Sequence, residues 1–178
     1  MIPFPDKKYQ IIYADPPWEY RDKNNGKFQS IMPNYKTMKI EDIINLPVKN
    51  ITDENCMLFM WVTFPALQEG LNVIKSWGFK YKTLGFSWIK TNHKNNKPFF
   101  GIGYYTKSNC EVCLIGVKGK PIKESNKVSS VVISPLRGHS QKPDIIRNKI
   151  VEFCGNLPRI ELFARQKTEG WDVWGNEV

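Results

Sequence analysis

The sequence predicts a single α/β domain over residues 1–178, with a sheet between two layers of helices. Three observations support this fold class. Segments with the composition of buried strands alternate with segments of helical periodicity. Several strand-like segments are apolar throughout, as in sheets that are covered on both faces. The length of 178 residues is that of one domain, and 41% hydrophobic residues exclude a disordered chain.

The first half of the chain contains two predicted strands and two predicted helices. Residues 9–14 form a short buried strand that ends at Asp15 and two prolines. We expect a short helix from a Thr37 cap to residue 44, with Pro47 ending it. Residues 56–62 form a second buried strand, and Thr63 caps a helix that runs to residue 77 and stops at Gly78.

The second half continues this alternation around one long loop. Residues 79–89 are extended, and residues 90–108 have no periodicity, which predicts a loop of the length often used for function. Strands are predicted over 111–117 and 129–134, a helix over 143–154, and strands over 159–164 and 171–174. Ligands of such sheets bind at the carboxyl ends of strands, so we expect the site after residues 14 and 164.

Charge points to an anionic partner. The net charge is +9, and no Asp or Glu occurs between Gly70 and Cys110, a stretch that contains seven lysines. Nucleic acid is the first candidate for such a basic chain, although a solvated lysine surface would have the same composition.

The cysteines and the apolar runs indicate a cytoplasmic protein. Cys110 and Cys113 form one C-x-x-C pair without the partners of a zinc site, so we predict no metal and a buried free thiol at Cys113. The longest apolar run, residues 56–62, is too short to span a bilayer. The first residues lack the hydrophobic segment of a secretory signal.

The stretch Tyr13-Ala14-Asp15-Pro16-Pro17-Trp18 is the most informative. Two prolines fix the backbone and remove two amide donors, so the Asp15 carboxylate and nearby carbonyls can form a cluster of acceptors. An indole stands beside them. Such a site suits a flat ligand that carries an amino group, whereas a Pro-Pro turn with a core tryptophan is the structural alternative.

This stretch resembles the Asp-Pro-Pro-Trp signature of METTL-type adenine amino-methyltransferases, which include bacterial and phage DNA enzymes. Six further blocks resemble the family in order: residues 34–38, 59–63, 88–92, 113–119, 142–144 and 159–165, and Trp174-Gly175-Asn176 closes the series. The resemblance implies a Rossmann-like sheet that uses S-adenosylmethionine. Its motif order is permuted, with the catalytic loop first, which fits the lack of a Gly-rich loop after the first strand.

The resemblance also implies roles for particular residues. Asp15, Pro16, Pro17 and Trp18 would form the catalytic loop, in which Asp15 and Pro16 hold the adenine amine and Trp18 stacks on the base. The implied cofactor-binding residues are Asp15, Lys142, Phe163, Ala164, Arg165, Asn176 and Glu177. Two positions depart from the family pattern: Gln141 replaces the usual His, and Ala164 replaces a frequent Gly.

The expected substrate-binding residues lie mostly in or near the loop at 90–108. Lysines there can neutralise phosphates, and aromatic rings can stack on bases. The residues expected to bind substrate are Tyr35, Lys90, Lys94, Lys97, Tyr104, Lys107 and Glu111. An aromatic cluster under a loop is the alternative interpretation.

We therefore expect methylation of the adenine 6-amino group in DNA, without membrane association. RNA is the second candidate substrate, and a compact chain resembles the bacterial and phage members more than the large RNA enzymes. A catalytically silent nucleic-acid-binding subunit is the alternative of another class, and pairing as a homo- or heterodimer is compatible with the sequence. An intact Asp-Pro-Pro-Trp argues against the silent subunit, and Asp15 argues against a cytosine enzyme, which usually has Ser there.

Overall fold

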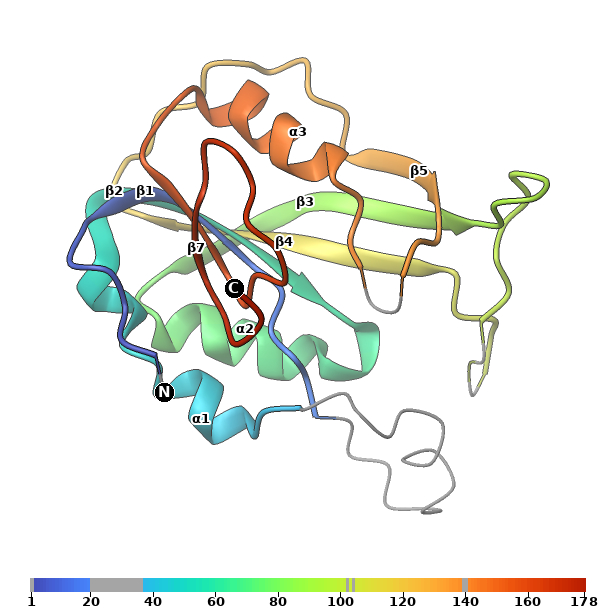
Figure 1. Cartoon of the computed structure of the whole chain (residues 1–178), viewed down its shortest axis with the longest axis horizontal. Helices are drawn as coiled ribbons and strands as arrows, with labels where there is room; N and C mark the ends of the chain where they lie inside the picture. The colour runs from blue at the N-terminus through green and yellow to red at the C-terminus, as the bar shows by residue number, and fades with distance from the viewer. Residues whose placement is uncertain (1, 20–36, 102, 104, 139–140) are drawn as a thin grey trace.

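The computed structural model describes residues 2–19, 37–101, 103, 105–138 and 141–178. Within these residues the core of the fold is a seven-stranded sheet in the order β5-β3-β4-β2-β1-β6-β7. The strands are β1 (Tyr9–Ala14), β2 (Thr52–Val62), β3 (Lys80–Thr91), β4 (Cys110–Lys118), β5 (Val131–Pro135), β6 (Arg159–Leu162) and β7 (Asp172–Trp174). Helices α1 (Ile40–Ile44) and α2 (Leu67–Ser76) lie on one face, and α3 (Ile145–Cys154) lies on the other (Figure 1). The predicted three-layer, Rossmann-like α/β class is confirmed.

The strand directions bring distant segments to one edge of the sheet. β1 pairs in parallel with β2 and β6, β6 with β7, and β3 with β5, while β4 is antiparallel to both of its neighbours. The carboxyl ends of the parallel strands and the first residues of β4 therefore share one edge. β1 is the point where the chain order reverses, because β2 lies on one side of it and β6 on the other. Ligands of open α/β sheets bind at such a point.

Successive side chains of the central strands point to opposite faces of the sheet, so the core consists of two clusters, one on each face. Ile12 and Ala14 of β1 belong to the cluster beneath α1 and α2, whereas Ile11 and Tyr13 belong to the cluster beneath α3. Both sets are buried because a strand covered on two faces has no solvent side. The run Cys56–Val62 is apolar for the same reason.

All three helices begin later than predicted: α3 begins at Ile145 rather than at residue 143, and neither threonine cap is formed. Thr37 does not cap α1, which begins at Ile40 after Lys39 and has no side-chain cap. Thr63 precedes a 3-10 turn (Phe64–Ala66) before α2, and its buried hydroxyl has no hydrogen-bond partner. Another 3-10 turn (Val48–Ile51) leads into β2.

Strand boundaries differ from the prediction where polar residues sit in the sheet. β2 begins at Thr52, before the apolar run, and β3 continues through Lys90 to Thr91. The loop between β3 and β4 is thus shorter than predicted. It contains isolated bridges between Thr91 and Pro98 and between Gly101 and Ser108.

Candidate active site

Asp15 occupies the first position after the central strand. Its amide donates to the Leu162 carbonyl of β6 at 3.5 Å, so the backbone here is still tied to the sheet. Its carboxylate is partly exposed, and Lys142 Nζ contacts its Oδ2 at 2.8 Å. Burial raises the pKa of Asp15, and Glu111 and Glu161 add to this effect, although Lys142 opposes it.

The backbone after Asp15 supplies two carbonyls. The Trp18 amide donates to the Pro16 carbonyl at 2.9 Å, and the Met38 amide donates to the Pro17 carbonyl at 2.9 Å. A carbonyl oxygen has two lone pairs, so each can accept a second hydrogen bond. The fold uses one lone pair of each carbonyl, and the expected cluster of acceptors with Asp15 stays a prediction.

Trp18 does not stand beside this cluster as an exposed ring. Its side chain is 5% exposed and belongs to the core beneath α2. Its Nε1 donates to the Trp61 carbonyl of β2 at 3.0 Å. The indole thus ties the Asp15 loop to the core, and its expected stacking on a base stays a prediction.

Four charged side chains of alternating sign form a row at this edge of the sheet, which we call the charge row: Asp15, Lys142, Glu111 and Lys90. Lys142 Nζ lies 2.8 Å from Asp15 and 3.2 Å from Glu111, and Lys90 pairs with the other oxygen of Glu111. All four side chains are mostly shielded from solvent, with exposures from 9% to 22%.

Tryptophan rings support the cations of the charge row. The Lys142 ammonium lies 5.6 Å from the centroid of Trp61, and that of Lys90 lies 5.4 Å from the centroid of Trp88. The two rings meet edge to face at 6.4 Å. Ring faces attract cations, so the two rings add to the contacts that hold both ammonium groups in the charge row.

The charge row gives Lys90 an ion-pair partner that the sequence did not predict. We expected Lys90 to contact phosphate, but it lies in β3 and its ammonium is engaged by Glu111. Burial alone would raise the pKa of Glu111, but Lys142 and Lys90 outweigh burial and hold it below its ordinary value. The carboxylates likewise hold the pKa of Lys142 above its ordinary value despite burial.

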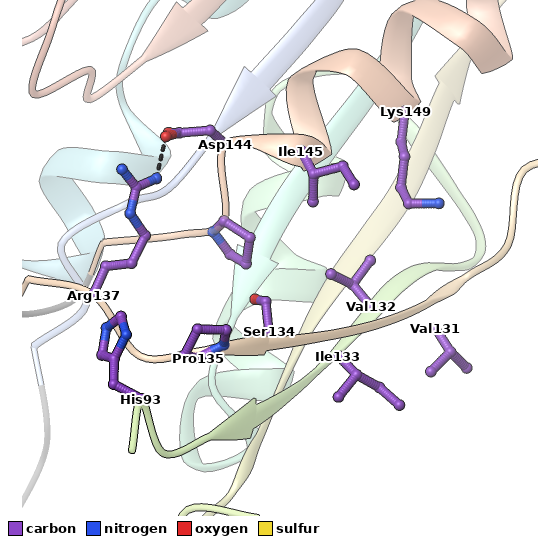
Figure 2. Close-up of a pocket in the computed structure, with 11 residues that line it drawn as sticks. His93, Val131, Val132, Ile133, Ser134, Pro135, Arg137, Asp144, Ile145 and Lys149 are labelled. Carbon is purple, nitrogen blue, oxygen red and sulfur yellow. Dashed lines mark hydrogen bonds and ion pairs between the residues drawn. The ribbon is translucent and has the colours of Figure 1, made fainter. Parts of the chain in front are cut away.

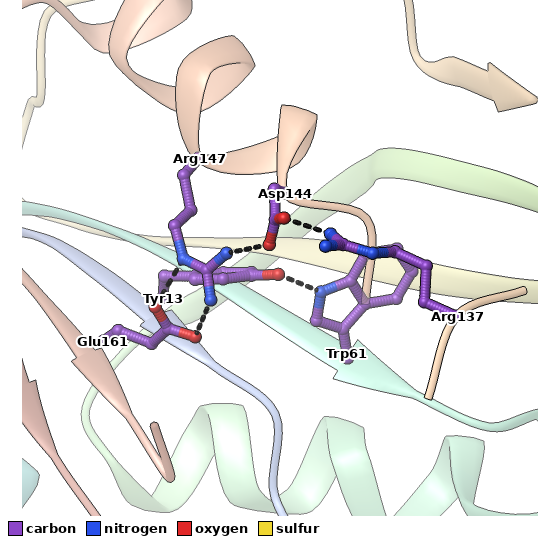
Figure 3. Close-up of polar contacts among 6 residues, drawn as sticks. All are labelled: Tyr13, Trp61, Arg137, Asp144, Arg147 and Glu161. Carbon is purple, nitrogen blue, oxygen red and sulfur yellow. Dashed lines mark hydrogen bonds and ion pairs between the residues drawn. The ribbon is translucent and has the colours of Figure 1, made fainter. Parts of the chain in front are cut away.

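A second ionic network was not predicted from the sequence. Arg147 of α3 binds Glu161 of β6 through two bonds, of 2.6 and 2.7 Å, and also contacts Asp144 at 2.9 Å. Arg137 pairs with the other oxygen of Asp144. Figure 3 shows these contacts around Tyr13, whose hydroxyl accepts from Trp61 Nε1 at 2.7 Å. The network joins α3 to the sheet beside Asp15.

The segments after β6 and β7, which contain most of the expected cofactor-binding residues, contact each other. Phe163 has a φ of 62°, and the buried Ala164 donates its amide to the Trp174 carbonyl at 3.0 Å. A side chain at Gly175 would collide with the backbone, because its Cβ would lie 2.3 Å from the Ala164 carbonyl oxygen. Arg165 Nε contacts Glu177 at 3.2 Å on the surface, and Asn176 is exposed beside them.

Other expected substrate residues lie away from the charge row or outside the described residues. Lys94, Lys97 and Lys107 are exposed in the loop between β3 and β4. Tyr35 and Tyr104 lie outside the described residues. Cys113 is buried and free, as predicted.

A groove of about 550 Å³ lies between β5 and the start of α3. Figure 2 shows Ile133, Ile145 and Lys149 along it, with the Arg137–Asp144 pair at one end. None of the four residues of the charge row lines this groove.

The residues that the structure describes contain neither a metal cluster nor a membrane-spanning helix. No group of three or more His, Cys, Asp or Glu side chains there is arranged to hold a metal ion. Among the same residues, no helix is both long and apolar enough to cross a membrane.

Comparison with known proteins agrees with this architecture. The MT-A70 family model matches residues 9–177. Type II methyltransferase M.MunI of Mycoplasma sp is 37% identical over 98% of this chain and 79% of its own length. The human N(6)-adenosine-methyltransferase catalytic subunit METTL3 is 29% identical over 96% of this chain and 28% of its own length. A rice protein, probable N(6)-adenosine-methyltransferase MT-A70-like, is 29% identical over 96% of this chain, which spans 23% of the rice protein.

Proposed function

Since the chain belongs to the MT-A70 family, we propose that it transfers a methyl group from S-adenosylmethionine to the exocyclic 6-amino group of adenine in DNA. One observation carries the proposal. A partly exposed carboxylate, Asp15, follows β1 at the edge of the sheet where the segments after β6 and β7 begin. Acceptor and cofactor segments thus lie at adjacent strand ends.

The acceptors around Asp15 suit an aromatic amine. The amine of adenine is a weak nucleophile because its lone pair is conjugated with the ring. A carboxylate that accepts one amine hydrogen, and the free lone pair of the Pro16 carbonyl that accepts the other, favour a pyramidal nitrogen and orient its lone pair. The contribution of these residues is orientation and electrostatic stabilisation, without a covalent intermediate.

The chemistry of the residues after β6 and β7 fits S-adenosylmethionine. Glu177 offers a carboxylate that can accept both ribose hydroxyls, and Asn176 and Arg165 offer donors beside it. The backbones at Gly175 and Ala164 approach each other too closely for a side chain at Gly175. When bound, the cofactor supplies a methyl group on a positively charged sulfur.

Nucleic acid must present an unpaired adenine to Asp15. The amine is paired and stacked inside a duplex, so the base flips out or the substrate is single-stranded. The exposed Lys94, Lys97 and Lys107 of the loop between β3 and β4 supply phosphate contacts in this proposal. Identity to the Type II methyltransferase, 37%, exceeds identity to the N(6)-adenosine-methyltransferases, 28–30%, and supports DNA over RNA.

The test uses methyl-labelled S-adenosylmethionine with separate pools of duplex DNA, single-stranded DNA and RNA, each digested to nucleosides afterwards. We expect label in N6-methyldeoxyadenosine. Label only in RNA would show that RNA, the second candidate, is the substrate instead of DNA. Label in cytosine, or no transfer with any pool by protein that binds the cofactor, would overturn it.

A further inference from the structure

Two residues of the charge row, Glu111 and Lys90, are linked to Asp15 through a chain of ion pairs. Glu111 is at the start of β4, where it pairs in register with Trp88 of β3, and Lys90 lies two residues further along β3. The backbone positions of both residues are therefore fixed by the pairing of two neighbouring strands. Lys142 lies outside any helix or strand. Its contacts with the carboxylates of Asp15 and Glu111 help to hold its side chain in place.

We propose that Glu111 and Lys90 are positioning residues for Asp15 that act through Lys142. The proposal rests on the role given to Asp15 under the proposed function. Glu111 anchors Lys142 to the sheet, and Lys142 then holds the Asp15 carboxylate through Oδ2. Lys90 neutralises Glu111, so that Glu111 does not draw the Lys142 ammonium away from Asp15.

The balance of charge in the row explains why four residues are needed. A single ammonium shared by two carboxylates leaves one negative charge in a shielded site, and such charges are costly unless paired. Lys90 supplies the second positive charge. The row is then neutral, and Asp15 can stay ionised although burial favours its neutral form.

The ionisation of Asp15 is the quantity that the charge row controls. A protonated carboxyl would donate a hydrogen bond where the amine needs an acceptor. The groups that face Asp15 are Lys142 from the segment before α3, Glu111 and Cys113 from β4, Glu161 from β6 and Tyr13 from β1 itself. Removing Glu111 removes a negative charge, which lowers the pKa of Asp15. Removing Lys90 leaves Glu111 unneutralised and raises it.

The distances set the size of the effect. Asp15 and Glu111 contact the same nitrogen, so their oxygens lie no more than roughly 6 Å apart. Coulomb's law at that separation gives a shift of about 0.5 pH unit in water and about 2 units at the effective dielectric constant of a protein.

The experiment measures the pKa of Asp15 in two ways. The first is the acid limb of the pH profile of kcat for methyl transfer at saturating cofactor. The second is a carbon-13 carboxyl NMR titration, assigned with Asp15→Asn, which needs no activity. Glu111→Gln should move both to lower pH, and Lys90→Gln should move both to higher pH. In each variant kcat should fall about tenfold, with less than a threefold change in KM for the oligonucleotide.

Matched variants separate positioning from general damage. Lys82→Gln removes an exposed charge from the other end of β3, and Glu54→Gln does so on β2; neither should move the titration. Lys90→Arg should restore the wild-type titration. Shifts of the same sign in Glu111→Gln and Lys90→Gln, or shifts no larger than in the matched variants, would overturn the proposal. If wild-type protein methylates no nucleic acid, the proposed function fails, while the NMR titration still decides whether the charge row controls Asp15.

Discussion

Replacing Trp18 distinguishes a structural indole from a base-stacking one. The side chain is buried beneath α2 and donates to the Trp61 carbonyl at 3.0 Å. Trp18→Ala leaves a cavity in that core, which costs about 3–5 kcal/mol of unfolding free energy. Trp18→Phe keeps an aromatic ring but leaves the Trp61 carbonyl without this donor, which costs about 1–3 kcal/mol.

These losses are large for a domain of this size. Each kcal/mol lowers the melting temperature by about 2–4 °C in proteins of similar length, so Trp18→Ala should melt about 6–20 °C below wild type. Urea unfolding followed by circular dichroism measures the free energy, and an unchanged m-value would show that two-state unfolding is preserved. Binding of an adenine oligonucleotide is measured at a temperature where both variants are folded.

The result depends on where the ring acts. If Trp18 ties the Asp15 loop to the core, the free energy of unfolding is lower in Trp18→Phe than in wild type and lowest in Trp18→Ala. Oligonucleotide binding by the folded fraction then changes less than about tenfold. If Trp18→Ala keeps the wild-type urea midpoint while oligonucleotide binding weakens by ~1–3 kcal/mol, the value expected for a lost stacking contact, the structural reasoning is refuted.

Three further changes test the site and its support. Asp15→Ala should abolish methyl transfer and change cofactor affinity less than about tenfold, or ~1.4 kcal/mol, because Lys142 keeps its contact with Glu111; undiminished transfer would remove Asp15 from the chemistry. Replacing Lys94 and Lys97 with Gln should reduce the slope of log affinity against log salt by about 1.8 on duplex DNA, and an unchanged slope would mean that neither contacts phosphate. Arg147→Met should cost about 3–5 kcal/mol in urea unfolding, since it leaves the buried partner carboxylate unpaired, and an unchanged midpoint would contradict that role.

Local patterns in the sequence were enough to predict the central strands. β1 has the predicted limits, because an apolar run bounded by Asp15 and two prolines has one interpretation. The start of β2 was missed because residues 52–55 are polar and join the sheet only through pairing with their neighbours. Thr37 and Thr63 were expected to cap helices on residue type alone, and the backbone begins each helix further along the chain.

The site was predicted as far as its motif, but its pairing was not. Asp15 followed from the Asp-Pro-Pro-Trp stretch, whereas its contact with Lys142 joins residues 127 positions apart. Lys90 was grouped with solvent-exposed lysines because the stretch from Gly70 to Cys110 contains no acid. Its partner, Glu111, directly follows Cys110, at the end of that stretch. A charged residue inside an apolar strand, as at Glu161, was the available signal for the second network.

The place of β1 in the sheet also matters while the chain is being made. One edge of β1 pairs with β2, but the other pairs with β6, which begins at Arg159, about 145 residues after β1 ends. At typical rates of translation this interval is roughly 7 to 30 s. During it the nascent chain carries a largely apolar strand with one open edge, a template for intermolecular pairing. We therefore expect recovery of folded protein to depend on chaperone capacity during synthesis, and slower, cooler expression to raise the yield.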